Sequence, residues 1–194
     1  PYCEGSMVAV LKQFTGEYIR EIYGRQLIGK VKLSQKAIAL TLEELEKESI
    51  LKARKQGNIK LYRLNMESIE IKDMLIIVEY LKKKEFLAKH RTLAHLFKED
   101  KRIIGIFGSY AKDTQKEDSD IDMFIIGKKI PEDYEEKGKK FDLDVSIKYF
   151  SEKEWRQLVK NKNNLWKEII SHHVLIFGME KFVNVIWKEY YGLN

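Results

Sequence analysis

The chain has 194 residues, of which 44% are hydrophobic and 34% are charged, and this balance excludes a disordered protein. Its length suits one large domain or two small ones, and no apolar run approaches the roughly 18 residues of a membrane span. The one cysteine, Cys3, excludes a disulfide framework and a multi-thiolate metal site within a single chain. We expect residues 1–6 to be an expression remnant before Met7 and, without a secretory leader, a cytoplasmic location.

Positive charge is concentrated in residues 7–66, which hold 12 Lys and Arg residues against 6 Asp and Glu. Residues 67–194 are nearly neutral, with 24 against 23. The apolar spacing of residues 7–14, 17–26 and 35–48 predicts short helices, with Ser34 as the N-cap of the third. Strand-like alternation on both sides of a turn at residues 56–58 then predicts a hairpin. This order resembles a winged helix-turn-helix, which we expect over residues 7–66.

The predicted hairpin carries a basic surface suited to nucleic acid. No acidic residue occurs between residues 49 and 66, so Lys55 and Lys60 are expected to contact the phosphate backbone of duplex DNA. Gln35 and Lys36, near the start of the third helix, are candidates for contacts with bases or phosphates. The middle turns of this helix carry Ala39 and Leu40, which cannot form hydrogen bonds with bases through their side chains. The alternative is a winged module that binds another protein.

Residues 67–85 are predicted to form a connecting helix, and residues 86–194 a second domain with C-terminal helices. The lysines at positions 82–84 separate two apolar stripes, which indicates a solvated joint between two helices. The second of these helices is expected to pack under the sheet of the second domain. The first either connects the domains or forms a homodimer contact.

The most informative motif lies between residues 102 and 127. An apolar run over residues 103–107 predicts a buried strand that ends at Gly108 and Ser109. The backbone N–H groups of such a turn, a hydroxyl and a following helix N-terminus all favour a phosphate. After ten more residues, Asp120 and Asp122 begin a second apolar run, and side chains two apart in a strand share a face. Both carboxylates can therefore hold one hard cation, which indicates phosphoryl or nucleotidyl transfer.

This arrangement of Gly108-Ser109 and Asp120-x-Asp122 resembles the signature of the DNA polymerase β-like nucleotidyltransferase superfamily, and more closely the minimal nucleotidyltransferases. The resemblance covers residues 86–150 and implies an α+β fold with a mixed sheet flanked by helices. It also implies a third carboxylate on a following strand, for which Asp144 and Asp142 are candidates. We favour Asp144, because the apolar residues after it resemble the family's pattern.

The resemblance implies a function as well. Gly108 and Ser109 are expected to bind a nucleoside triphosphate, and Asp120, Asp122 and Asp144 to be catalytic and to hold two Mg²⁺ ions. AMP from ATP is the expected donor group, and a hydroxyl on a partner protein is the expected acceptor, as in antitoxins that modify a toxin. The alternative is a DNA-binding transcriptional regulator whose second domain only senses nucleotide.

The remaining residues predict helices that complete the second domain. Ser151 and Glu154 have the spacing of a capping box at the start of one of them. His172 and His173 are adjacent, so on a helix they would not face a common metal ion.

Overall fold

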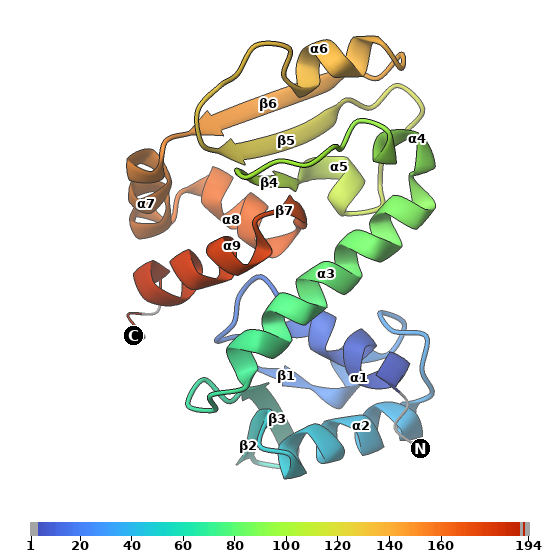
Figure 1. Ribbon diagram of the computed structural model, residues 1–194. Coiled ribbons are helices and arrows are strands. Elements are labelled where there is room, and N and C mark those ends of the chain that lie inside the picture. Colours follow the sequence, from blue (N-terminus) through green and yellow to red (C-terminus); the bar gives the residue numbers. More distant parts are fainter. Residues whose placement is uncertain (1–3, 191, 193–194) are drawn as a thin grey trace. The chain divides into compact units, whose positions relative to one another are not determined.

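The computed structural model describes residues 4–190 and 192 of the chain (Figure 1). The chain divides into two compact units, residues 1–78 and 79–194. Both units contain helices and strands, so the chain has the α+β class expected from the sequence. Within the described residues, no helix combines the length and the apolar composition that a membrane crossing requires.

The first unit contains a three-stranded antiparallel sheet with the strand order β1-β3-β2. Strands β2 and β3 form the hairpin predicted from the sequence, with Gln56 opposite Ile59 at its tip. The elements are α1 (Glu4–Leu11), the 3-10 helix η1 (Lys12–Phe14), β1 (Ile22–Tyr23), the 3-10 helix η2 (Gly24–Leu27), α2 (Gln35–Lys47), β2 (Leu51–Gln56) and β3 (Ile59–Leu64).

One helix predicted for the first unit is absent. The sequence predicts a helix over residues 17–26, but Ile22 and Tyr23 form strand β1 and pair with Tyr62 and Leu61 of β3. Gly24 then begins the short helix η2. A β-branched and an aromatic residue gain cross-strand packing in a sheet, and this pairing overrides the helical spacing of the apolar side chains. The order is therefore helix, strand, 3-10 turn, helix and hairpin.

Helix α2 agrees with its prediction to within one residue at its end. The hydroxyl of Ser34 accepts a hydrogen bond from the backbone N–H of Ala37 at 3.2 Å, which makes Ser34 the N-cap. Such a cap is typically worth about 1 kcal/mol. Ile38, Leu42 and Leu45 are buried along one side of the helix, as their spacing predicts.

Helix α3 (Ile71–Lys89) is continuous, so the joint predicted at residues 82–84 is wrong. Lysine is a good helix former, and Lys82 Nζ lies 2.9 Å from Oε2 of the fully buried Glu79. His173 Nε2 lies 3.3 Å from the other oxygen of this carboxylate. Burial by itself would raise the pKa of Glu79, but the charges of Lys82 and His173 lower it to about 2. The sequence indicated a break where the helix instead carries a buried ion pair.

The second unit contains a mixed four-stranded sheet in the order β6-β5-β4-β7. Strands β5 and β6 are parallel, and β4 is antiparallel to both of its neighbours. After α3, the elements are α4 (Arg91–Ala94), β4 (Ile103–Ile106), α5 (Gly108–Ala111), β5 (Ile121–Ile126), α6 (Tyr134–Lys139), β6 (Val145–Phe150), α7 (Glu152–Asn161), α8 (Asn164–Ser171), β7 (Val174–Phe177), α9 (Met179–Val185) and a π-helical turn (Ile186–Tyr190).

Helical side chains cover both faces of this sheet. One face packs its isoleucines and Met123 against Phe86, Leu93, Leu96 and Tyr134, in one buried cluster. On the other face, Phe124 stacks on Trp155 of α7, with ring centroids 5.7 Å apart and planes inclined by 4°. The sheet therefore has a hydrophobic core on each face, so a site on this sheet would have to form at the ends of its strands.

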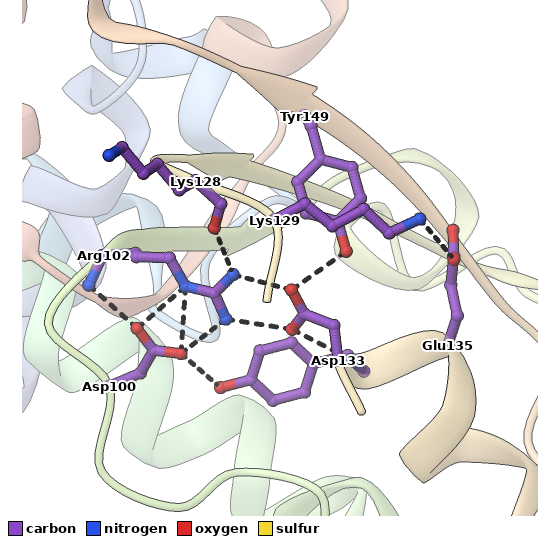
Figure 2. A network of polar contacts seen from close by, with 8 residues as sticks. Asp100, Arg102, Lys128, Lys129, Asp133, Glu135 and Tyr149 are labelled. Atoms are coloured by element: carbon purple, nitrogen blue, oxygen red, sulfur yellow. Dashed lines mark hydrogen bonds and ion pairs between the residues drawn. The ribbon is translucent and has the colours of Figure 1, made fainter. Parts of the chain in front are cut away.

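A polar network holds the connection between β5 and β6 (Figure 2). Arg102 donates to both carboxylate oxygens of Asp133, at 2.7 and 2.9 Å, and to Asp100 at 2.7 Å. The hydroxyl of Tyr134 donates to Asp100 at 3.1 Å, and that of Tyr149 donates to Asp133 at 3.0 Å. Asp133 is also the N-cap of α6. The network therefore anchors the helix that leads into β6.

Candidate active site

The Gly108-Ser109 turn lies where strand β4 ends. The N–H of Phe107 donates to the carbonyl of Asp122 at 2.9 Å, and Gly108 follows with a φ of +68°, a left-handed conformation that glycine adopts at little cost. Helix α5 has only four residues, so it lacks the sizeable dipole that the sequence suggested. A phosphate at this turn would depend on the first backbone N–H groups of α5 and on the Ser109 hydroxyl.

Asp122 contacts the same turn. It is the second residue of β5, and its carboxylate lies so close to Gly108 that a Cβ there would overlap Oδ2. Gly108 is buried and Asp122 is half-buried. The close approach and the positive φ are two separate reasons for a glycine at this position. The fold thus brings the predicted phosphate turn against one of the predicted metal ligands.

Asp120 and Asp144 are neighbours, each directly before the first residue of the paired strands β5 and β6. Ile121 pairs with Val145 in the parallel register, and the N–H of Ile121 donates to the carbonyl of Asp144 at 2.8 Å. The residues that precede this pair, Asp120 and Asp144, are therefore neighbours, and both are exposed. Asp142 has a φ of +54° in the turn before β6 and lies off the strand. The register favours Asp144 over Asp142 as the partner of Asp120.

Negative charge is in excess around Asp122. Burial, and then the charges of Asp120 and Glu168, raise the pKa of Asp122 above its usual value. The cations Lys148 and Lys112 act in the opposite direction but do not cancel the effect. A bound cation would relieve this repulsion between carboxylates.

Glu168 is a site residue that the sequence did not indicate. It lies on α8, and its Oε1 is 2.9 Å from Nζ of Lys112, which caps the end of α5. The ion pair joins two positions 56 residues apart in the chain. No short-range spacing signals such a pair, so only the packing of α8 near the Gly108 turn places Glu168 here.

The predicted metal triad is not gathered into a coordination shell. Among the described residues, no three His, Cys, Asp or Glu side chains are close enough together to hold a metal ion. The donor chemistry nevertheless fits a hard divalent cation, since all the candidate groups are carboxylates. Carboxylates without a bound cation repel one another, and those of Asp120 and Asp144 are exposed to solvent.

A comparison with protein families identifies the region that holds this site. Residues 91–181 match the family model described as Polymerase beta, Nucleotidyltransferase. The match supports the nucleotidyltransferase superfamily for this part of the chain, and it supports a transferase. The matched region includes Gly108, Ser109 and the three predicted carboxylates. A search of curated proteins and a search of solved structures each found no match.

Gly108→Ala should displace Asp122, which the sequence predicts to be catalytic, and lower nucleotidyl transfer by roughly 100-fold. A misplacement of about 1 Å at a catalytic group has this order of cost. The added Cβ would overlap Oδ2 of Asp122. Gly29→Ala is the matched control, since Gly29 also has a positive φ, +80°, but no atom lies within 4 Å of its added Cβ. Steady-state rates for both variants, with thermal unfolding of each, test this. Equal activities would show that the close approach of Gly108 and Asp122 is not needed.

Proposed function

We propose that the second unit transfers a nucleoside monophosphate, AMP from ATP, to an acceptor hydroxyl and releases pyrophosphate. The observation that carries the proposal is the packing of Asp122 on the Gly108-Ser109 turn. Asp120 and Asp144 are adjacent at the start of the neighbouring strands β5 and β6. A phosphate turn beside paired carboxylates suits phosphoryl chemistry, in which positioning and charge neutralisation dominate the barrier. The matched nucleotidyltransferase region supports the same reaction class.

Two Mg²⁺ ions fit the proposal, with Asp120, Asp122 and Asp144 as their ligands. When bound, they would neutralise the triphosphate and acidify the acceptor hydroxyl. The Ser109 hydroxyl and the N–H groups of the turn would bind the outer phosphates. In this proposal Asp144, which is exposed just before strand β6, accepts the proton of the acceptor hydroxyl.

The acceptor that we propose is a hydroxyl of a partner protein, in the manner of an antitoxin acting on its toxin. Asp120 and Asp144 are both exposed, which leaves room for a macromolecular acceptor at the start of strands β5 and β6. The resemblance to minimal nucleotidyltransferases favours this acceptor over a small molecule. A cytoplasmic location and a homodimer accompany this proposal as predictions.

Incubation with labelled ATP and Mg²⁺ tests the proposal, with the chain alone and with the product of the neighbouring gene. We expect label on the partner protein, and none when Mg²⁺ is chelated. Binding of ATP without transfer of label to any acceptor would instead support the second candidate, a DNA-binding regulator that senses nucleotide. That candidate rests on the basic first unit, which the transfer reaction does not use.

We further propose that residues 7–66 form a winged helix-turn-helix that binds duplex DNA. Gln35 and Lys36 are exposed at the start of α2, where a recognition helix would meet the major groove. A hollow of about 510 Å³ lies between η2, α2 and the β2–β3 hairpin, and its lining includes Arg25, Gln35 and Lys60. Arg25 and Gln35 are exposed and Lys60 is half-buried. Polar and basic groups around one hollow are compatible with phosphate and base contacts.

The four proposed DNA-binding residues are not equivalent. Lys55 is exposed near the hairpin tip, directly opposite Lys60 in the register. Lys60 Nζ lies 2.5 Å from Oε2 of Glu46, and this hydrogen bond raises the pKa of Lys60. Binding of a phosphate by Lys60 would first require the ion pair with Glu46 to break. Lys55 and Lys36 should therefore contribute more to DNA binding.

Lys36→Gln with Lys55→Gln should weaken binding to all duplex sequences alike. It should also reduce the slope of log K against log salt by about 0.9 for each phosphate that the protein no longer neutralises. Gln35→Ala should instead relax any sequence preference. Titrations of the full chain at several salt concentrations test this, with Lys98→Gln and Lys139→Gln together as a control of equal charge on the second unit. Equal weakening in both double variants would argue for a protein partner of the first unit.

A further inference from the structure

A hollow of about 420 Å³ lies in the second unit, at the opposite end of strand β5 from Asp122. Ile103, Ile126 and Trp155 form its apolar lining, and all three are buried. Asp122 is the second and Ile126 the last residue of β5, so about 13 Å of strand separates them at roughly 3.3 Å per residue. The hollow is therefore distinct from the candidate active site. Its volume lies within the range of about 300–1,000 Å³ that is typical of small-molecule sites.

Cationic side chains from three parts of the fold surround this hollow. Lys101 precedes β4, Arg156 lies on α7 and Lys181 lies on α9, and all three are exposed. Lys181 Nζ donates to the carbonyl of Lys101 at 3.2 Å. In the part of the chain that the structure describes, neither Lys101 nor Lys181 forms an ion pair, and Glu152 is the one acidic residue of the lining. The rim thus carries a net positive charge that an anion would balance.

Arg102 contributes its aliphatic stem, rather than its charge, to the wall of the hollow. Its guanidinium is turned toward Asp100 and Asp133 (Figure 2), which already neutralise it. Gly127 stands beside this stem, and a Cβ there would lie 2.8 Å from Cγ of Arg102. The cationic character of the hollow therefore comes chiefly from Lys101 and Lys181.

We propose that this hollow binds a phosphorylated small molecule, with its phosphate at the cationic rim. The apolar lining would receive the uncharged part of the ligand, and the amide of Asn184, which also lines the hollow, offers both a donor and an acceptor. Cationic groups above a mostly apolar floor are the arrangement expected for such a ligand. The site stands on these observations alone and does not require the proposed transfer reaction.

Calorimetric titration of the full chain with AMP and with inorganic pyrophosphate tests the proposal. Asp120→Asn and Asp122→Asn are present throughout, so that binding at the candidate active site is weakened. In this background, Lys101→Gln with Lys181→Gln should weaken AMP binding about tenfold, because two charge-assisted hydrogen bonds are removed. The matched control, Lys98→Gln with Lys139→Gln, removes the same charge from exposed positions outside the hollow and should leave the affinity unchanged.

A second readout separates local binding from a general effect of charge. Trp155 lines the hollow, so the NMR signal of its indole N–H should shift on AMP addition. In the Lys101/Lys181 variant the same shift should need about tenfold more AMP to reach half of its maximum. The proposal is overturned if AMP and pyrophosphate show no saturable binding, or if the two double variants lose affinity alike. It is also overturned if a single-stranded oligonucleotide binds through these lysines while AMP does not.

Discussion

Asp122→Asn should reduce nucleotidyl transfer by about a thousandfold without unfolding the protein. In the proposed function Asp122 is a metal ligand, and loss of such a ligand removes several kcal/mol of charge stabilisation in the transition state. Each 1.4 kcal/mol is about tenfold in rate. Asp122 packs on the Gly108 turn, so its loss would separate the metal from the phosphates. Asp120→Asn and Asp144→Asn should behave in the same way. Single-turnover assays with labelled ATP measure all three.

The same substitution should leave stability unchanged or raise it slightly. The pKa of Asp122 is raised by burial and by its acidic neighbours, so its charged form is disfavoured in the folded state. The resulting destabilisation is complete at neutral pH, declines as the pH falls through the folded pKa and is absent below the unfolded pKa. A neutral Asn relieves the repulsion, as is common where function conflicts with stability. Thermal unfolding at pH 7 checks this, and a large loss of stability would contradict the assignment of a repulsive cluster.

Asp142→Asn is the matched control for the three carboxylates that we propose to be catalytic. It changes the same chemical group two residues before Asp144, but Asp142 lies in a left-handed turn off the strand. Activity close to that of the unmodified chain is expected. If Asp142→Asn is inactive and Asp144→Asn is active, the third carboxylate is Asp142, and the register argument for Asp144 is wrong.

Arg102→Ala should destabilise the second unit by about 3–5 kcal/mol, because removal of one partner leaves buried charges uncompensated. Asp133 is 3% exposed and Asp100 10% exposed, and both depend on the Arg102 guanidinium. Arg91→Ala, at an exposed position of the same unit, is the control and should change stability little. Denaturant unfolding of the full chain measures both. A loss below about 1 kcal/mol would mean that the network behaves like a surface ion pair.

The destabilisation caused by Arg102→Ala should be smaller in acid. Burial by itself would raise the pKa of Asp100 and of Asp133, but hydrogen bonds from Arg102 lower both below their usual values. The network's contribution is therefore complete above the unfolded carboxyl pKa of about 3.9 and is lost as the pH falls through the folded values. Without Arg102, protonation would instead relieve the buried charge. The difference in unfolding free energy between the two proteins should thus be smaller at pH 4 than at pH 7.

Local signals were sufficient for several elements. Ser34 caps α2, and Ser151 with Glu154 forms the capping box of α7, in which the N–H of Ser151 donates to Glu154 at 2.8 Å. The turn after Gln56 and the strands on both sides of it are also present. Each of these features depends on residues within a few positions of one another, so the sequence contains the whole interaction.

Tertiary packing explains why the helix predicted over residues 17–26 and the joint predicted at residues 82–84 are wrong. The apolar residues around Ile22 and Tyr23 have a helical spacing, but these two residues pair with strand β3 and form strand β1. The lysines after residue 81 suggested a break, but buried Glu79 holds Lys82 within a continuous helix. The partner of Ile22 and Tyr23 lies on another strand, whereas Glu79 is only three residues before Lys82 on the same helix. What the sequence did not show for the helix is the burial of Glu79 beside His173. In both cases tertiary packing outweighs local propensity.

The sequence by itself determined the glycine-serine turn after a strand, the acidic pair at the start of the next strand and the concentration of basic charge before residue 67. The tertiary structure alone decided that Asp144 adjoins Asp120, that Glu168 adds its charge to the site, and that cations gather at the far end of β5. The physical reason is that charges interact according to their separation in space. Strand register and helix packing set that separation between residues far apart in the chain.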